Sequence, residues 1–254
     1  MTLSYILLAT FIAGVISVLL AALLALTWLP RFADRMVAFA VGVLLTFAFT
    51  GLLPEATHLG LEVEQVGQIV LVGIVGFFLL EKAALWRHDH AHQHAIEHDR
   101  KPHPPQVHMI VLGDGLHNFV DGVLIAAAFM VDTTLGWATT VAVLAHELPQ
   151  EIGDFMVLLN AGLTKRRALA LNALSGAAMM LGGVTGYLAL GSAQAATPYV
   201  IVIAAASFIY IAVADLVPEL HRHRRFGDAA AQLALLLAGM ATVYWVNQLM
   251  PHTH

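Results

Sequence analysis

No cysteine occurs anywhere in the 254 residues, so disulfide bonds and metal sites built on thiolates are excluded. Charge is scarce as well: Asp, Glu, Lys and Arg make up 11% of the chain, whereas a soluble domain usually carries about 25%. Hydrophobic residues make up 59%, and the mean hydropathy is +0.78. A net charge of −5 gives no sign of a nucleic-acid partner. The composition indicates an all-α integral membrane protein, with one transmembrane domain over residues 1–254 and the lipid bilayer around it.

Eight apolar windows have the length of a membrane-crossing helix, which needs about 20 residues. They lie near residues 3–28, 36–53, 66–86, 109–130, 136–161, 168–190, 198–217 and 229–249. The first window lacks the basic start of a signal peptide and is longer than the apolar run of one. We therefore expect it to stay in the protein as the first of eight transmembrane helices.

The basic residues predict how these helices are oriented. All twelve Lys and Arg fall at alternate connections, namely Arg31 and Arg35, Lys82 to Lys101, Lys165 to Arg167, and Arg222 to Arg225. Because basic loops stay in the cytoplasm, both termini are expected outside, in a multi-pass protein of the cell (inner) membrane. An odd number of spans would break this alternation.

Two of the windows carry ionisable residues at membrane depth, where such residues are costly and normally mark a functional site. The candidate ligands are His117, Asn118 and Asp121 in the fourth window and His146, Glu147, Gln150 and Glu151 in the fifth. A spacing of four residues puts His117 with Asp121, and His146 with Gln150, on one face of a helix. Imidazole, carboxylate and carboxamide groups in a dry place suit a divalent transition metal of borderline softness. Hydrogen bonding between helices is the plainer explanation for any one of these residues, but a poor one for all of them.

The depth of the two histidines supports one shared site. His117 lies roughly 8 residues, or about 12 Å, into its helix, and His146 roughly 10 residues, or about 15 Å, into the next. Both depths fall near the middle of a hydrocarbon layer about 30 Å thick. Two antiparallel helices with matching motifs are typical of an inverted pseudo-twofold around a midplane site, as in secondary transporters. Pro149 is expected to displace the carbonyl of Ala145 toward this site.

The segment 87–108 is the second unusual feature, because seven histidines lie between His88 and His108. It has no apolar pattern, so we expect a disordered cytoplasmic loop. Histidine-rich tracts usually bind metal, and this one is expected to capture, buffer or sense it. Asp114 and Asp154 are expected to orient ligand histidines or to hold helices together.

Two runs of residues resemble signatures of the ZIP (Zrt- and Irt-like) family of divalent metal transporters. The run from Gly113 to Gly122 resembles the fourth-helix signature, and the run from His146 to Asp154 resembles the fifth-helix signature H-E-x-P-H-E-x-G-D. The resemblance implies import of zinc, or of iron, manganese or cadmium, by alternating access. It implies metal ligands at His117, Asn118, Asp121, His146, Glu147 and position 150. It also implies a 3+2+3 arrangement of eight helices and movement of a helix group that includes the fourth and fifth.

The chain departs from the family pattern at two places. Gln150 stands where this subgroup usually has histidine, and the window 168–190 has no ionisable residue, whereas some members place a glutamate there. Both departures predict a less charged site.

Two other functions share part of this pattern. A cation-diffusion-type metal exporter also uses His-x-x-x-Asp in a span, but that class has six spans rather than eight. An intramembrane metal-dependent hydrolase would need the second histidine of H-E-x-x-H, and Gln150 fills that position. The prediction is therefore a metal importer that is not an enzyme, with divalent metal ions as its partners and a homodimer as a further expectation.

Overall fold

The computed structural model describes residues 1–27, 31–92, 104–221 and 226–249, and every regular element in these ranges is helical. The main helices are α1 (Thr2–Phe11), α2 (Ser17–Thr27), α3 (Arg31–Phe47), α4 (Leu53–His58), α5 (Val63–His92), α6 (Pro104–Val131), α7 (Thr133–Asn160), α8 (Lys165–Ser192), α9 (Thr197–Tyr210), α10 (Val217–Leu220) and α11 (Phe226–Leu249). Three π-helical segments, η1 (Ile12–Ile16), η2 (Ala48–Leu52) and η4 (Ile211–Leu216), and a short 3₁₀ turn, η3 (Gln194–Ala196), join some of them. The all-α prediction is confirmed.

Among the described residues, seven stretches of helix are long and apolar enough to cross a membrane. They agree with seven of the eight predicted windows and confirm the integral membrane class. The remaining window corresponds to α7, which at 28 residues is long enough. Its polar residues, His146 to Glu151 among them, lower its hydropathy. The count of eight spans therefore stays a prediction.

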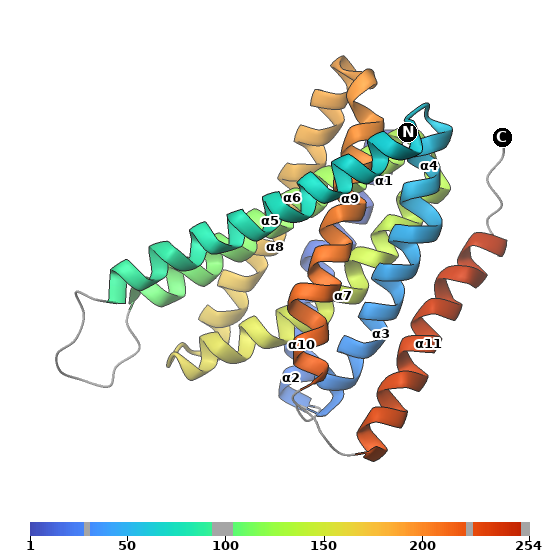
Figure 1. The fold of residues 1–254 in the computed structure, drawn as a ribbon. Coiled ribbons are helices and arrows are strands. Elements are labelled where there is room, and N and C mark those ends of the chain that lie inside the picture. The colour runs from blue at the N-terminus through green and yellow to red at the C-terminus, as the bar shows by residue number, and fades with distance from the viewer. Residues whose placement is uncertain (28–30, 93–103, 222–225, 250–254) are drawn as a thin grey trace.

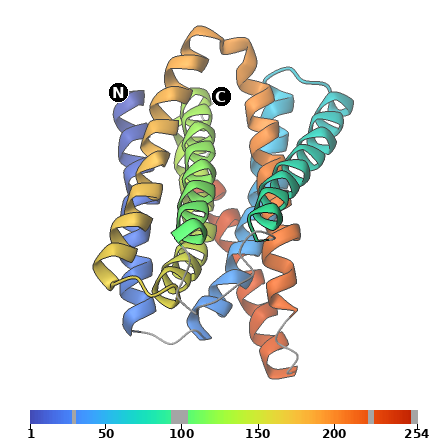
Figure 2. The same ribbon diagram turned by 90° about the vertical axis from the view of Figure 1, so that its left-hand side faces the viewer.

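Helices α6 and α7 pack side by side at the centre of the bundle (Figure 1). Figure 2 shows α1, α2 and α8 on one side of α6, and α5 and α9 on the other. On the first side α8 packs along α6 and against α1, while on the second α9 packs against α5 and α3 against α11. Little of α5 or α11 is buried within the chain, so their apolar faces are left for the bilayer.

Each π-helical segment has a local cause. In η1, the Ser17 hydroxyl donates to the carbonyls of Ala13 and Gly14, and such a hydroxyl inserted into the helix ladder distorts it. Segments η2 and η4 are followed by Pro54 and Pro218, the second residues of α4 and α10. A proline ring clashes with the carbonyl four residues earlier, and a widened π turn gives that carbonyl room.

These two proline sites share a short sequence. Leu52-Leu53-Pro54-Glu55 completes η2 and begins α4, and Leu216-Val217-Pro218-Glu219 completes η4 and begins α10. The helices that carry them, α3 and α9, run in opposite directions (Figure 1). They are the second helix of the first predicted triplet and the second of the last, so this repeat supports the predicted 3+2+3 arrangement, which otherwise stays a prediction.

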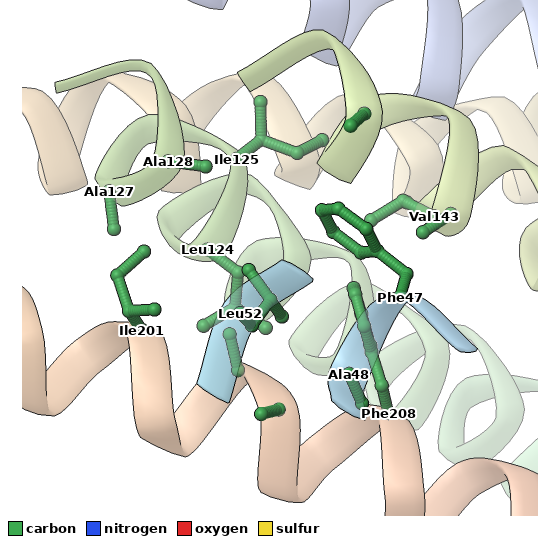
Figure 3. Packing of buried hydrophobic residues seen from close by; sticks show 14 of the residues in the cluster. Phe47, Ala48, Leu52, Leu124, Ile125, Ala127, Ala128, Val143, Ile201 and Phe208 are labelled. Atoms are coloured by element: carbon green, nitrogen blue, oxygen red, sulfur yellow. The ribbon is translucent and has the colours of Figure 1, made fainter. Parts of the chain in front are cut away.

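A dry apolar cluster holds α6 against the helices of the other side (Figure 3). Its largest members are each at most 2% exposed and come from α3, η2, α6 and α9, namely Phe47, Leu52, Leu124, Ile125, Ile201 and Phe208. The ring of Phe208 lies 5.9 Å from that of His146, centroid to centroid. Closely packed apolar side chains therefore lie on one side of His146.

Two glycines allow α6 and α8 to touch backbone to backbone. A Cβ atom on Gly122 would overlap the carbonyl oxygen of Met179, and one on Gly182 would overlap that of Phe119. Small residues are the usual means of such close approach between membrane helices. This contact fixes the position of the helix that carries His117 and Asp121.

The helices reach further into the histidine-rich segment 87–108 than the sequence predicts. Helix α5 continues to His92, and α6 begins at Pro104, a residue that is favourable in the first turn of a helix because its missing N–H is not needed there. The rest of the segment, 93–103, lies outside the described residues, so its predicted disorder and cytoplasmic placement stay predictions.

Candidate metal site

Four of the predicted ligands come together between α6 and α7. His117 and Asp121 of α6 and His146 and Glu147 of α7 each offer one ligand atom, and these four atoms lie within 4.8 Å of one another. The i,i+4 spacing on α6 and the neighbouring positions on α7 aim all four at the seam between the helices.

The four atoms are two imidazole nitrogens and two carboxylate oxygens. Nε2 of His146 lies 3.0 Å from Oδ2 of Asp121 and 3.7 Å from Oε1 of Glu147. Nε2 of His117 lies 3.3 Å from the same Glu147 oxygen and 3.8 Å from the same Asp121 oxygen. Zn²⁺ binds nitrogen and oxygen ligands of this kind, in fours, at about 2.0–2.2 Å, so the donor set fits zinc after small side-chain movements.

The centre is buried, and His117 lies at its edge. Asp121, His146 and Glu147 are fully buried, whereas 25% of the His117 side chain is exposed. Nε2 of His117 is nevertheless buried, so all four ligand residues turn buried atoms toward the centre.

Several atoms of the centre have no hydrogen-bond partner among the described residues, namely Nε2 of His117, Oδ1 of Asp121 and both carboxylate oxygens of Glu147. Buried polar atoms are almost always hydrogen-bonded, because an unpaired one keeps the full cost of desolvation. Unpaired buried atoms on three of the four ligand residues favour a site for a cation.

The contacts of His146 point the same way. Its Nδ1 lies 3.2 Å from the carbonyl oxygen of Ala142, so the proton of the neutral ring is best placed on Nδ1. Nε2 then turns a lone pair toward Asp121 at 3.0 Å, and two lone pairs at that distance need a proton or a metal ion between them. A backbone carbonyl that orients a ligand histidine in this way is usual in metal sites.

Asn118, Glu151 and Gln150 do not join these four. The amide nitrogen of Asn118 donates to the carbonyl and to Oδ1 of Asp114, at 3.2 and 3.0 Å. Glu151 instead groups with Glu147 and Asp114. Gln150 is half-buried on α7, and its role as a ligand stays a prediction.

Two polar residues of α8, for which the sequence predicts no role, also reach this region. The Ser175 hydroxyl donates to Oδ2 of Asp114, and the Asn172 amide donates to the backbone carbonyl of Glu151 at 3.2 Å. Both residues are at most 3% exposed. They are three residues apart, so a helix puts both on one face, and this spacing is the feature of the sequence that indicates them. They lie in the window 168–190, which has no ionisable residue.

Comparison with known proteins gives one consistent answer. The family model described as ZIP Zinc transporter matches residues 84–247, which is more than half of the chain. Zinc transporter foi of Drosophila melanogaster is 41% identical over 133 residues, 52% of this chain and 19% of its own length. Human Zinc transporter ZIP6 is 40% identical over 146 residues, which are 55% of this chain and 19% of its own length. Mouse Metal cation symporter ZIP14 is 47% identical over 113 residues, which are 44% of this chain and 23% of its own length. The chain thus spans about a fifth of the length of these curated relatives.

Proposed function

The chain belongs to the ZIP zinc transporter family, and from that membership we propose that it imports zinc across a membrane through the centre between α6 and α7. The observation that carries the proposal is the group of four ligand atoms that His117, Asp121, His146 and Glu147 bring together between the two helices. Nε2 of His117 and both carboxylate oxygens of Glu147 are buried and have no hydrogen-bond partner among the described residues. Transport, rather than hydrolysis, is the function that the names of the relatives share.

Zinc is the proposed substrate because two imidazoles and two carboxylates form a donor set of borderline softness. Iron, manganese and cadmium are the proposed competitors. The full proposed ligand set also includes three residues with side-chain oxygen atoms near these four along α6 and α7. The set is then His117, Asn118, Asp121, His146, Glu147, Gln150 and Glu151.

We further propose that the basic connections are cytoplasmic, with both termini outside and the histidine-rich segment inside. In that orientation α6 runs outward, so Leu124 and Ile125 lie on the outer side of Asp121. The apolar cluster of Figure 3 would then close the outer route to the metal, while the partly exposed side chain of His117 lies at the edge of the centre. Alternating access would require α6 and α7 to move relative to α3 and α9, which opens this cluster. The histidine-rich segment would receive the imported ion.

A homodimer remains part of the proposal. The apolar side chains that α5 and α11 leave exposed, such as Leu79 and Leu237, can be covered by lipid or by a second copy of the chain. Crosslinking between copies in the membrane would distinguish a homodimer from a chain covered by lipid alone.

Isotope uptake into proteoliposomes tests the function directly. We expect uptake of zinc-65 by the parent, with unlabelled cadmium, iron and manganese competing in that order of decreasing softness. His117→Ala, Asp121→Ala and His146→Ala should each lower uptake by at least about tenfold, since even partners of metal ligands commonly contribute 10–100-fold to affinity. His58→Ala is the matched control, because His58 is 62% exposed at the end of α4, away from the centre. Parent-like uptake by well-folded His117→Ala and His146→Ala would place the transport site elsewhere.

A further inference from the structure

The side-chain amide of Asn118 is held by two acceptors on one residue. Its nitrogen lies 3.2 Å from the backbone carbonyl oxygen of Asp114 and 3.0 Å from Oδ1 of the same residue. An amide nitrogen carries two hydrogens, so each acceptor can take one of them. Rotation of the amide by half a turn would instead place its oxygen against two other oxygens with no proton between them. Asp114 therefore fixes which end of the amide faces it.

The amide oxygen that this arrangement leaves over is buried and unpaired. Asn118 is fully buried, and its Oδ1 has no hydrogen-bond partner among the described residues. Asp114 lies about one turn before Asn118 on α6, and Asp121 lies about one turn after it, so the three share a helix face. With the nitrogen held toward Asp114, the oxygen is left at the opposite edge of the amide, on the side of Asp121 and the zinc centre.

The carboxylate of Asp114 is in turn held from α8. The Ser175 hydroxyl donates to Oδ2 of Asp114, while Oδ1 accepts from Asn118. The same hydroxyl lies 2.9 Å from the backbone carbonyl oxygen of Asn172, but it has one proton to give, and a carboxylate is the stronger acceptor. Ser175 is 3% exposed and Asp114 is 6% exposed, so water does not compete for this bond.

Close packing of α6 and α8 brings Ser175 to this position. A Cβ atom on Gly115 would lie 3.7 Å from the Cβ of Ser175, and Ser175 precedes Met179, which contacts Gly122, by about one turn. No described hydrogen bond joins Ser175 to any of the four residues of the zinc centre. The described hydrogen bonds that lead from Ser175 toward that centre run through Asp114 to Asn118.

We propose that Ser175 is a positioning residue, which acts through Asp114 to keep the amide oxygen of Asn118 turned toward the metal. The proposal rests on the proposed function in taking Asn118 as a ligand. Without the Ser175 hydroxyl, the Asp114 carboxylate is free to rotate away from the amide nitrogen, and the amide then samples both orientations. Only one orientation offers an oxygen, so the apparent affinity for metal falls with the fraction of chains that hold it.

Zinc titration of the purified full-length chain tests this role. We expect Ser175→Ala to weaken zinc binding roughly three- to tenfold, which corresponds to the loss of one hydrogen bond. Ser175→Thr keeps the hydroxyl and should bind zinc like the parent. Ser192→Ala is the matched control, because Ser192 is an exposed serine of α8 whose hydroxyl lies 2.8 Å from the carbonyl oxygen of Ala189 on the same helix. It should also bind zinc like the parent.

A double-mutant cycle separates positioning from a general effect on the fold. Because Ser175 acts through Asn118, Ser175→Ala should cause no further loss of zinc affinity in a chain that already carries Asn118→Ala. In the parent background, its loss should be larger for Mn²⁺ than for Cd²⁺, because the harder ion depends more on oxygen ligands. An equal loss in the presence and absence of the Asn118 amide would overturn the proposal, as would parent-like binding by Ser175→Ala.

The Asn118→Ala variant alone gives a test that needs no change at Ser175. If this chain binds zinc like the parent, the amide oxygen is not a ligand and Ser175 has nothing to position. His146→Ala, titrated beside it, keeps this failure apart from failure of the zinc centre. Lost binding in His146→Ala with parent-like binding in Asn118→Ala refutes the role of Ser175 and leaves the zinc centre standing. Parent-like binding in His146→Ala would instead refute the zinc centre.

Discussion

At the scale of the residue, the site depends on which atoms are left unpaired. His146 is fixed by the Ala142 carbonyl on one side and faces Asp121 on the other, so its free lone pair has one direction. Glu147 is the only residue common to the two groups of possible ligands in the described chain. Its neighbours, by contrast, each belong to one group.

This grouping predicts different losses for conservative changes at three carboxylates. Glu147→Gln and Asp121→Asn should each weaken zinc binding by at least about tenfold, because the amide removes charge from the four-ligand centre. Glu151→Gln should weaken zinc binding less, because this carboxylate lies outside those four ligands. Calorimetric titration of the three variants with zinc measures this. Equal losses in all three would mean that the carboxylates form one undivided site.

Position 150 gives a second prediction at this scale. Gln150→His should raise the preference for zinc over manganese by adding a nitrogen donor, whereas Gln150→Glu should lower it by adding a harder, charged oxygen. Competition between the two metals in uptake assays gives the ratio directly. An unchanged ratio in both variants would show that position 150 does not face the metal.

At the scale of the element, the glycines of α6 decide how closely it approaches α8. Gly122 lies against the backbone of Met179 and Gly183, whereas Gly113 on the same helix has nothing within 4 Å of its would-be Cβ. Gly122 is also next to Asp121, so a displacement there moves a ligand. The two glycines form a matched pair for testing whether helix packing sets the site.

We expect Gly122→Ala to lower the free energy of unfolding by about 1–3 kcal/mol, the usual cost of overpacking, and to weaken zinc binding. Gly113→Ala should leave zinc binding unchanged and stabilise the helix by up to about 1 kcal/mol, because alanine favours the helix over glycine. Thermal unfolding in detergent and zinc titration of both variants provide the comparison. If Gly122→Ala binds zinc like the parent, the contact with α8 does not position Asp121.

At the scale of the whole molecule, the distribution of charge predicts the orientation of the bundle in the membrane. The basic connections alternate along the chain, and the helices described between them alternate in direction in Figure 1. The absence of cysteine from the sequence makes this orientation easy to test, because an introduced thiol is the only one in the chain.

Single cysteines should therefore react with a membrane-impermeant reagent from one side only. Thr133→Cys and Ala195→Cys, both exposed at connections without basic residues, should label in intact cells. Asn160→Cys, exposed at the last residue of α7 beside a basic connection, should label only after the membrane is opened. Labelling of Asn160→Cys in intact cells would reverse the proposed orientation.

The sequence alone determined the properties that depend on short stretches of chain. Hydropathy located the helices, since each must be apolar over about 20 residues to lie in a bilayer. Helical periodicity put His117 with Asp121 on one face, and the position of His146 within its apolar window put it opposite them. These inferences need no knowledge of which helices touch, apart from the short connection that makes α6 and α7 neighbours.

Only the tertiary structure decided how the seven predicted ligands divide. Asn118 turns to Asp114, and Glu151 joins them rather than the histidines, because α8 packs beside α6 through Gly122 and Gly182 and brings Ser175 and Asn172 to that side. No pattern within α6 or α7 contains this information, since Ser175 is 61 residues from the aspartate it contacts. Contacts between helices distant in sequence depend on the fit of their surfaces, and that fit assigns each polar group its partner.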